Sequence, residues 1–329
     1  MDWFERITGF AERSYGETRA ALTVADGRLR SVHSDRVCLV GELEIPTLAQ
    51  LRRRAGGMVG KPGAELKMST LQGDVRRLHS QPLNRQTLFQ VASQFNLLEM
   101  PGPDVTPEAG VTGYQDDRSQ GPACAIAAGA ATIYRNYLVP VDGATGQTSD
   151  RQIDCLADLG AALGNDKGQL WEMRNGYAMC TEKGLAVING KLAAMSDGER
   201  DELRGLLRIG LHWNVEVTEA SDPAQRVSQA FCSALPVAYS TVAPQHWERF
   251  ASLVLEGAYE ATLLAAVLNR EQTGCPTVFL TTLGGGAFGN PAAWIEAAMA
   301  RAMETMRGHD LDVRLVSFGG GAARKQPEA

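Results

Sequence analysis

A cluster of glycines after an apolar run is the feature of this chain best suited to bind an anion. Residues 277–283 are β-branched and apolar and predict a short buried strand. The loop after this strand contains the residues that we expect to contact the anion: Gly284, Gly285, Gly286, Ala287, Phe288, Gly289 and Asn290. Glycine lets backbone N–H groups approach a ligand closely, and Asn290 with Pro291 suits the start of a helix, whose first amides favour negative charge. The segment predicts a phosphate or pyrophosphate site, although a tight turn would use the same residue types.

A second candidate for chemistry is the long segment that follows residue 96. Its acidic residues include Glu99, Asp104, Glu108, Asp116 and Asp117. Carboxyl groups can protonate a leaving group or hold a water molecule at a glycosidic bond. A connection this long without regular structure is often functional in a compact domain, but a solvated acidic loop is the competing interpretation.

The elements that must position these residues predict an α/β protein. Strand and helix patterns alternate from Leu66 onward, which predicts a mixed or largely parallel sheet with helices on both faces. The predicted strands are residues 88–95, 211–217, 227–239 and 313–318, with a hairpin at about 177–191. The predicted helices are residues 47–54, 121–138, 151–163, 197–207 and 250–268. We divide the chain into a β-rich N-terminal extension (1–65) and a larger domain (66–329) with an insertion at about 143–222.

Composition excludes several classes of protein. A net charge of −6 over 329 residues argues against a general nucleic-acid binder, which needs a basic surface. The six cysteines form no CxxC pair, and the five histidines show no metal-binding spacing, so we expect no metal and a reducing, cytoplasmic location. The first residues show no secretory signal. Glu256 and Glu260 interrupt the most apolar helix, which predicts a core helix and not a membrane span.

Three segments, in this order, resemble the macrodomain family and its poly(ADP-ribose) glycohydrolase relatives. They are LQGDVRRL (71–78), QVASQFNLLEM (90–100) and LGGGAFGNP (283–291). The resemblance covers about residues 66–318, with the insertion unaligned. It implies a three-layer α/β/α fold and ADP-ribose as the ligand, with no further cofactor. The partner would be ADP-ribose or an ADP-ribosylated substrate, and a nucleic acid only if it carries ADP-ribose.

The resemblance also implies roles for single residues. Asp74 would accept a hydrogen bond from the adenine amino group beside the Val75 amide, although a helix cap is the competing role for Asp74. Asn96 would contact the distal ribose, although such an asparagine is also a common turn former. The loop from Gly284 to Gly289 would clasp the pyrophosphate, with Phe288 closing over the ribose. Phe318 would stack on adenine or serve as an ordinary core residue.

The chain departs from the family in the loop after Asn96, where two alignments compete. In the first, Gln115, Asp116 and Asp117 stand in for the Gln-Glu-Glu signature of the glycohydrolases. In the second, the helix beginning at Gln120, Gly121 and Pro122 forms the first phosphate loop. Both alignments can hold together. By this resemblance Asp117 is the first candidate for the catalytic carboxyl, Asp116 the second, and Glu108 the third.

The predicted function is hydrolysis of an ADP-ribosyl glycosidic bond. The alternative is a reader of ADP-ribosylated partners, or a sensor of NAD-derived metabolites, that uses the same pocket without turnover. A third class is a nucleotide-binding α/β enzyme that holds NAD or a nucleoside triphosphate. Its phosphate loop would require Ser or Thr after Gly60-Lys61, where this chain has proline.

Overall fold

The computed structural model describes residues 1–58 and 65–317. Its centre is a seven-stranded sheet in the order β4, β11, β12, β6, β13, β14, β5. These strands are β4 (Glu42–Glu44), β11 (Gly210–Glu216), β12 (Arg226–Cys232), β6 (Leu88–Ala92), β13 (Thr277–Leu280), β14 (Asp312–Ser317) and β5 (Lys67–Gln72). The five strands from β12 to β5 run parallel, whereas β11 is antiparallel to both of its neighbours. The predicted mixed sheet is confirmed.

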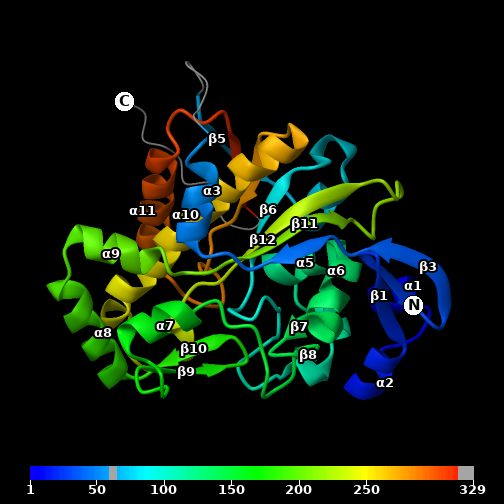
Figure 1. Ribbon diagram of the computed structural model, residues 1–329, viewed down its shortest axis with the longest axis horizontal. Helices are drawn as coiled ribbons and strands as arrows, with labels where there is room; N and C mark the ends of the chain where they lie inside the picture. Colours follow the sequence, from blue (N-terminus) through cyan, green and yellow to red (C-terminus); the bar gives the residue numbers. More distant parts are fainter. Residues whose placement is uncertain (59–64, 318–329) are drawn as a thin grey trace.

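Helices cover both faces of this sheet (Figure 1). On one face, α10 packs on the strands and contacts α3, α8, α9 and α11, and on the other face α4, α5 and α6 form the second layer. The first layer consists of α3 (Leu48–Ala55), α8 (Glu182–Ala194), α9 (Asp197–Arg204), α10 (Glu248–Thr273) and α11 (Ala292–Thr305). The second consists of α4 (Val75–Ser80), α5 (Gln120–Ala127), α6 (Gly129–Ile133) and the π-helical turn Tyr134–Leu138. The arrangement is a three-layer α/β/α fold.

The long helix α10 is the centre of the main core. By length and composition it could cross a membrane, but 89% of its most apolar window is buried inside the protein. Its side chains pack with those of the strands, as Val254 and Leu263 do in the main cluster of buried apolar residues. This burial is what a core helix requires.

The N-terminal residues form a small unit beside the second helical layer (Figure 1). It contains α1 (Trp3–Thr8), α2 (Tyr15–Ala20) and an antiparallel sheet of β1 (Leu22–Ala25), β2 (Arg28–Ser31) and β3 (Ser34–Leu39). Its apolar side chains share a second core with residues of α5 and α6. Two strands of the central sheet come from outside the sequence-based core domain, β4 from the extension and β11 from the insertion. The proposed domain boundaries stay a prediction, but the sheet crosses both of them.

The insertion differs from the sequence prediction at two points. The predicted helix over residues 151–163 begins only at residue 157. The hairpin consists of β9 (Trp171–Arg174) and β10 (Tyr177–Cys180), and α8 follows at once, so the predicted hairpin over residues 177–191 is wrong beyond residue 180. The helix begins there because the Thr181 side chain accepts a hydrogen bond from the Gly184 amide, as an N-cap does. The remaining elements are α7 (Ala157–Leu163) and the short strands β7 (Pro140–Val141) and β8 (Ala144–Thr145).

Candidate active site

A cavity of about 500 Å³ lies at the carboxyl edge of the parallel strands. Its walls include residues that end or directly follow five of them: Gly73 after β5, Ser317 of β14, Thr281 after β13, Ala92 of β6 and Ala234 after β12. This edge is where open α/β sheets bind ligands, because loops from several strands meet there. The glycine loop and the start of α5 line the same cavity, together with three acidic residues, Asp74, Glu99 and Asp117.

Some backbone amides of the glycine loop donate hydrogen bonds within the loop, and others have no protein acceptor. The amides of Gly285, Gly289 and Asn290 donate to carbonyl oxygens within the loop, at 2.9–3.0 Å. Within the described residues, four other loop amides have no protein acceptor, and their residues all line the cavity: Gly284, Gly286, Ala287 and Phe288. Unpaired amides gathered around a hollow are suited to bind an anion.

The starts of two helices add further free amides. Gln120 and Gly121 open α5, Val75 opens α4, and among the described residues their N–H groups have no acceptor. All three residues line the cavity. The Gln120 side chain holds α5 in place, because it accepts from the Ala92 amide at 2.9 Å and donates to the Gln90 carbonyl at 2.7 Å. Free backbone amides from three segments, the glycine loop and the starts of α4 and α5, therefore line the cavity.

Glu99 places a buried carboxyl group in the wall of this cavity. The residue is 5% exposed, and its Oε1 atom has no hydrogen-bond partner in the described structure. Burial raises the pKa of Glu99 well above its usual range; Arg135 opposes this shift and Asp117 adds to it. A carboxyl group with a raised pKa keeps its proton to higher pH and can donate it, so Glu99 has the environment of a general acid. A buried oxygen without a partner is also what a ligand would satisfy.

The turn that carries Glu99 is held from several sides. The Gln94 side chain pairs with both backbone groups of Met100, at 2.9 and 3.2 Å, and the Tyr177 hydroxyl donates to the Met100 carbonyl at 2.9 Å. The Glu99 amide donates to the Tyr114 hydroxyl oxygen at 3.0 Å. These bonds fix the backbone on both sides of the carboxyl group, which is the support that a catalytic side chain needs.

Gly121 lets the start of α5 approach Glu99. A Cβ at position 121 would overlap the Ala92 carbonyl oxygen and the Glu99 carboxyl group. The absence of this Cβ, more than backbone freedom, explains why glycine stands here. The free amides of α5 and the carboxyl group of Glu99 consequently face the same small volume.

An aromatic group lines the cavity on the side of Glu99. The rings of Tyr177, Tyr239 and Phe288 lie 5.2 to 5.7 Å apart between centroids. All three residues line the cavity, with Met100 and Pro101 beside them. Such a wall offers apolar contact to a sugar ring.

The structure brings only part of the predicted site together. The cavity is lined by Asp74, Val75, Asp117, Gly121, Gly284, Gly286, Ala287 and Phe288. The predicted residues outside its lining are Asn96, Glu108, Gln115, Asp116, Gly285, Gly289 and Asn290. Phe318 lies outside the described residues. The roles assigned to all of these residues stay predictions.

Residues outside the lining have other contacts. Asn96 is buried, donates to Gln152 Oε1 at 2.8 Å and accepts from the Leu98 amide at 3.1 Å, so it shapes the turn that carries Glu99. Glu108 accepts hydrogen bonds from Ser149, and Asp116 is exposed. Asn290 donates to the carbonyl of Leu235 at 2.9 Å, and α11 begins after Pro291 without a side-chain cap; the expected N-cap at Asn290 is therefore wrong.

Asp74 caps a helix, the competing role that the sequence left open, and its ligand role stays a prediction. Its Oδ1 atom accepts from the Arg76 amide at 2.9 Å, so the carboxylate caps α4. It also lines the cavity, and a carboxylate can accept further hydrogen bonds through its remaining lone pairs. Capping does not prevent contact with a ligand amine.

Glu99 is one of the acidic residues of the long segment after residue 96, but the resemblance favours Asp117, Asp116 and Glu108 for catalysis. The signal was its apolar neighbours, because a carboxyl in the run Leu97, Leu98, Glu99, Met100 is expected to be buried. Gln94, Tyr177 and Tyr239 were missed. Gln94 lies within QVASQFNLLEM, a segment that carries the resemblance, whereas nothing in the sequence context of the two tyrosines indicates a site. Over residues 1–58 and 65–317, no group of three or more His, Cys, Asp or Glu side chains could hold a metal ion.

Together, these observations define a three-layer α/β protein with a cavity at the carboxyl edge of its sheet. No protein-family model and no curated protein matches the chain. Among solved structures, it is similar to poly(ADP-ribose) glycohydrolase from Thermomonospora curvata, with 14% identity, a TM-score of 0.45, and coverage of 94% of this chain and 93% of that one. It is also similar to a mutant poly(ADP-ribose) glycohydrolase from Deinococcus radiodurans in complex with ADP-ribose, with 11% identity, a TM-score of 0.46, and coverage of 84% and 87%. Likeness at this level assigns neither a family nor an activity.

Proposed function

We propose that this chain binds ADP-ribose and hydrolyses an ADP-ribosyl glycosidic bond. The observation that carries the proposal is that one cavity joins free backbone amides, suited to a diphosphate, with the buried carboxyl group of Glu99, suited to a general acid. The order of the three motifs along the chain, with their macrodomain-like pattern, adds the nucleotide as the expected guest.

The chemistry of the lining residues supports one orientation of the ligand in the proposed complex. Asp74 and Val75, after β5, would receive the adenine, since a carboxylate accepts from an exocyclic amine. The pyrophosphate would lie on the amides of the glycine loop and of α5. The distal ribose would then reach Phe288, Tyr177 and Glu99.

Cleavage of the bond at the anomeric carbon passes through an oxocarbenium-like state. Glu99 would donate its proton to the leaving group, and after departure its carboxylate would take a proton from the attacking water. Asp117, exposed at the cavity wall, is the second carboxyl group and would hold that water or steady the developing positive charge. Asp117, the first candidate for the catalytic carboxyl by resemblance, would thus have the second role, and Glu99 the acid role.

The experiment compares binding and turnover in the same preparation. We expect ADP-ribose to bind in calorimetry and to be released from an ADP-ribosylated substrate. Glu99→Gln should lower kcat by a factor of about 10² to 10⁴ and keep the ADP-ribose Kd within a few-fold. Glu260→Gln is a matched control, because Glu260 is a buried carboxyl outside the cavity, and it should keep its kcat at low temperature. Binding without release from any linkage would favour the reader, and absence of binding would refute both.

A further inference from the structure

We infer that Glu12, in the N-terminal segment, is a positioning residue for the acid chemistry of Glu99. Glu12 does not line the cavity. It acts through a chain of hydrogen bonds that ends at the Glu99 backbone. The inference rests on the proposed function for its kinetic consequences but not for its structural ones.

The first link is the carboxylate of Glu12 itself. It accepts from the Val111 amide at 2.9 and 3.0 Å and from the Thr112 amide at 2.8 Å. The Tyr137 hydroxyl donates to the same carboxylate at 2.7 Å. These amides open the short 3-10 helix Thr112–Asp116, which has no capping side chain of its own. A residue 99 positions earlier in the chain thus supplies the missing cap.

The second link runs from this short helix into the cavity. Tyr114 lies within it, is 3% exposed, and accepts the hydrogen bond from the Glu99 amide. Asp117 follows the last residue of the helix and lines the cavity. One capping carboxylate therefore sets the position of a segment that contacts both acidic residues of the proposed reaction.

The residues around Glu12 leave room for its carboxyl group and hold the 3-10 helix close to it. Gly110 has a φ of 83°, and a Cβ there would overlap the Glu12 carboxyl group. The Trp3 ring nitrogen donates to the Thr112 carbonyl at 3.3 Å, and Trp3 itself is 2% exposed. Val111 and Tyr114 belong to the core that contains α1. The N-terminal unit thus holds the 3-10 helix in position through both polar and apolar contacts.

The test measures motion and catalysis separately in the full chain. Glu12→Gln keeps the size of the side chain but puts NH₂ where an oxygen accepts from amides. We expect faster hydrogen–deuterium exchange over residues 94–117 without ligand. We expect kcat to fall by about tenfold to a hundredfold with a KM within about threefold, since misplacing a reacting group affects the chemical step most. The basic limb of the kcat–pH profile, which reports Glu99, should shift. Glu17→Gln, an exposed residue of the same segment, should change none of these.

A second variant tests the same chain of hydrogen bonds in case Glu12→Gln fails to fold. Tyr114→Phe removes the hydroxyl oxygen that accepts from the Glu99 amide, and it should reproduce the fall in kcat. The double variant Glu12→Gln/Tyr114→Phe should lose little more than either single one, because both act on the same path. Additive losses, or unchanged exchange and kcat in Glu12→Gln, would overturn the inference. If the wild-type protein shows no hydrolysis, the proposed function fails, and the exchange rates alone decide the role of Glu12.

Discussion

At the scale of single residues, Glu99 is held in an environment that costs stability. Because burial raises its pKa, the folded protein binds a proton more tightly than the unfolded chain does. The free energy of unfolding therefore falls as pH rises from the unfolded pKa, near 4.5, toward the folded pKa. A carboxyl that is costly to the fold but lies in a cavity wall is typical of a functional group.

Glu99→Gln should remove this pH-dependent cost. We expect the melting temperature of the variant, relative to wild type, to rise as pH increases from 5 to 8, while turnover is lost. Calorimetric scans at several pH values measure this difference. A variant that is less stable than wild type by the same amount at every pH would show that Glu99 is a structural residue.

Gly286 tests the amide site without disturbing the fold. A Cβ at this position meets no atom within 4 Å, so Gly286→Leu should keep the melting temperature and place its side chain in the ligand volume. ADP-ribose affinity should fall more than a hundredfold in calorimetry. Gly190→Leu is the control, since Gly190 on α8 also has open space but lies outside the cavity. Unchanged affinity in Gly286→Leu would place the pyrophosphate elsewhere.

Gly121 should behave differently from Gly286. In Gly121→Ala the new Cβ overlaps the Ala92 carbonyl, so the start of α5 must shift. We expect a loss of about 1–3 kcal/mol of stability, as in other overpacked sites, together with a loss of turnover. Urea unfolding and the hydrolase assay measure the two effects, and an unchanged unfolding midpoint would contradict the close packing of α5 on Glu99.

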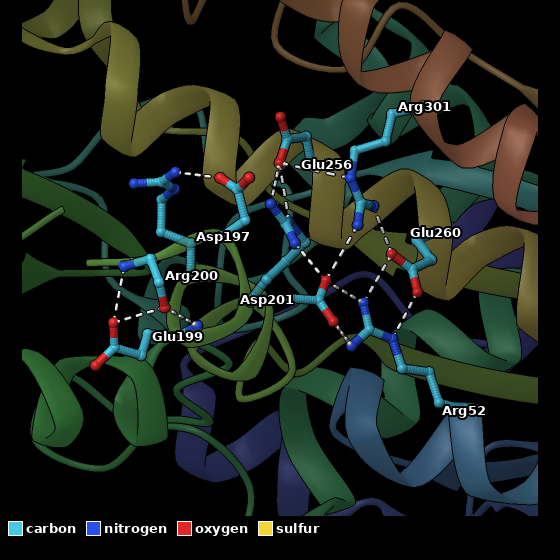
Figure 2. Close-up of polar contacts among 10 residues, drawn as sticks. Arg52, Asp197, Glu199, Arg200, Asp201, Glu256, Glu260 and Arg301 are labelled. Carbon is cyan, nitrogen blue, oxygen red and sulfur yellow. Dashed lines mark hydrogen bonds and ion pairs between the residues drawn. The ribbon is translucent and has the colours of Figure 1, made fainter. Parts of the chain in front are cut away.

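At the scale of elements, an ion-pair network joins four helices on the face of the sheet opposite α5. Figure 2 shows Arg52 of α3, Asp201 of α9, Glu256 and Glu260 of α10 and Arg301 of α11 in one connected group. Glu260 is the most buried member, with a side chain 5% exposed. Burial alone would raise its pKa, but hydrogen bonds from Arg52 and Arg301 outweigh that effect and lower it.

Glu260→Gln should leave two guanidinium groups without their main partner. We expect a loss of about 3 kcal/mol at pH 7, the low end for breaking a buried pair, because both arginines are partly exposed. This contribution should disappear as pH falls through the lowered pKa of Glu260. Arg85→Gln breaks an exposed pair with Asp222 and should cost less than about 1 kcal/mol. Equal effects of the two variants in urea unfolding would show that the network adds little.

The sequence predicted the elements better than their edges. Apolar runs located β6, β13 and β14, because buried parallel strands are continuous apolar segments. The helix α8 was missed because residues 177–191 begin with a true strand and contain Gly184 and Gly190, which look like breakers. The strand β4 of three residues carries two glutamates and gives no apolar signal.

The parts of the candidate site that consist of backbone amides could be predicted from the sequence. Glycine runs and helix starts are local, so the loop from Gly284 to Phe288 and the start of α5 could be found in the sequence. The apolar neighbours of Glu99 indicate its burial, but its place in the cavity wall depends on contacts with Tyr114 and Gly121 that the sequence does not show. Asn96 was assigned to the ligand by resemblance, whereas its amide is used inside the protein.

At the scale of the whole molecule, the parts converge on one edge of the sheet. Five strand ends form the floor of the cavity, two helices and the glycine loop supply amides, and the turn with Glu99 closes one side. The N-terminal unit stands behind this turn and does not reach the cavity itself. In the proposed complex, a dinucleotide diphosphate binds this edge with its anomeric carbon at Glu99.

The most direct test is a crystal structure of Glu99→Gln with ADP-ribose. We predict that the pyrophosphate oxygens accept hydrogen bonds from the amides of Gly286, Ala287 and Gly121, and that the anomeric carbon lies beside the side chain of residue 99. A ligand bound with its distal ribose turned away from residue 99, or an empty cavity at saturating ADP-ribose, would contradict the account.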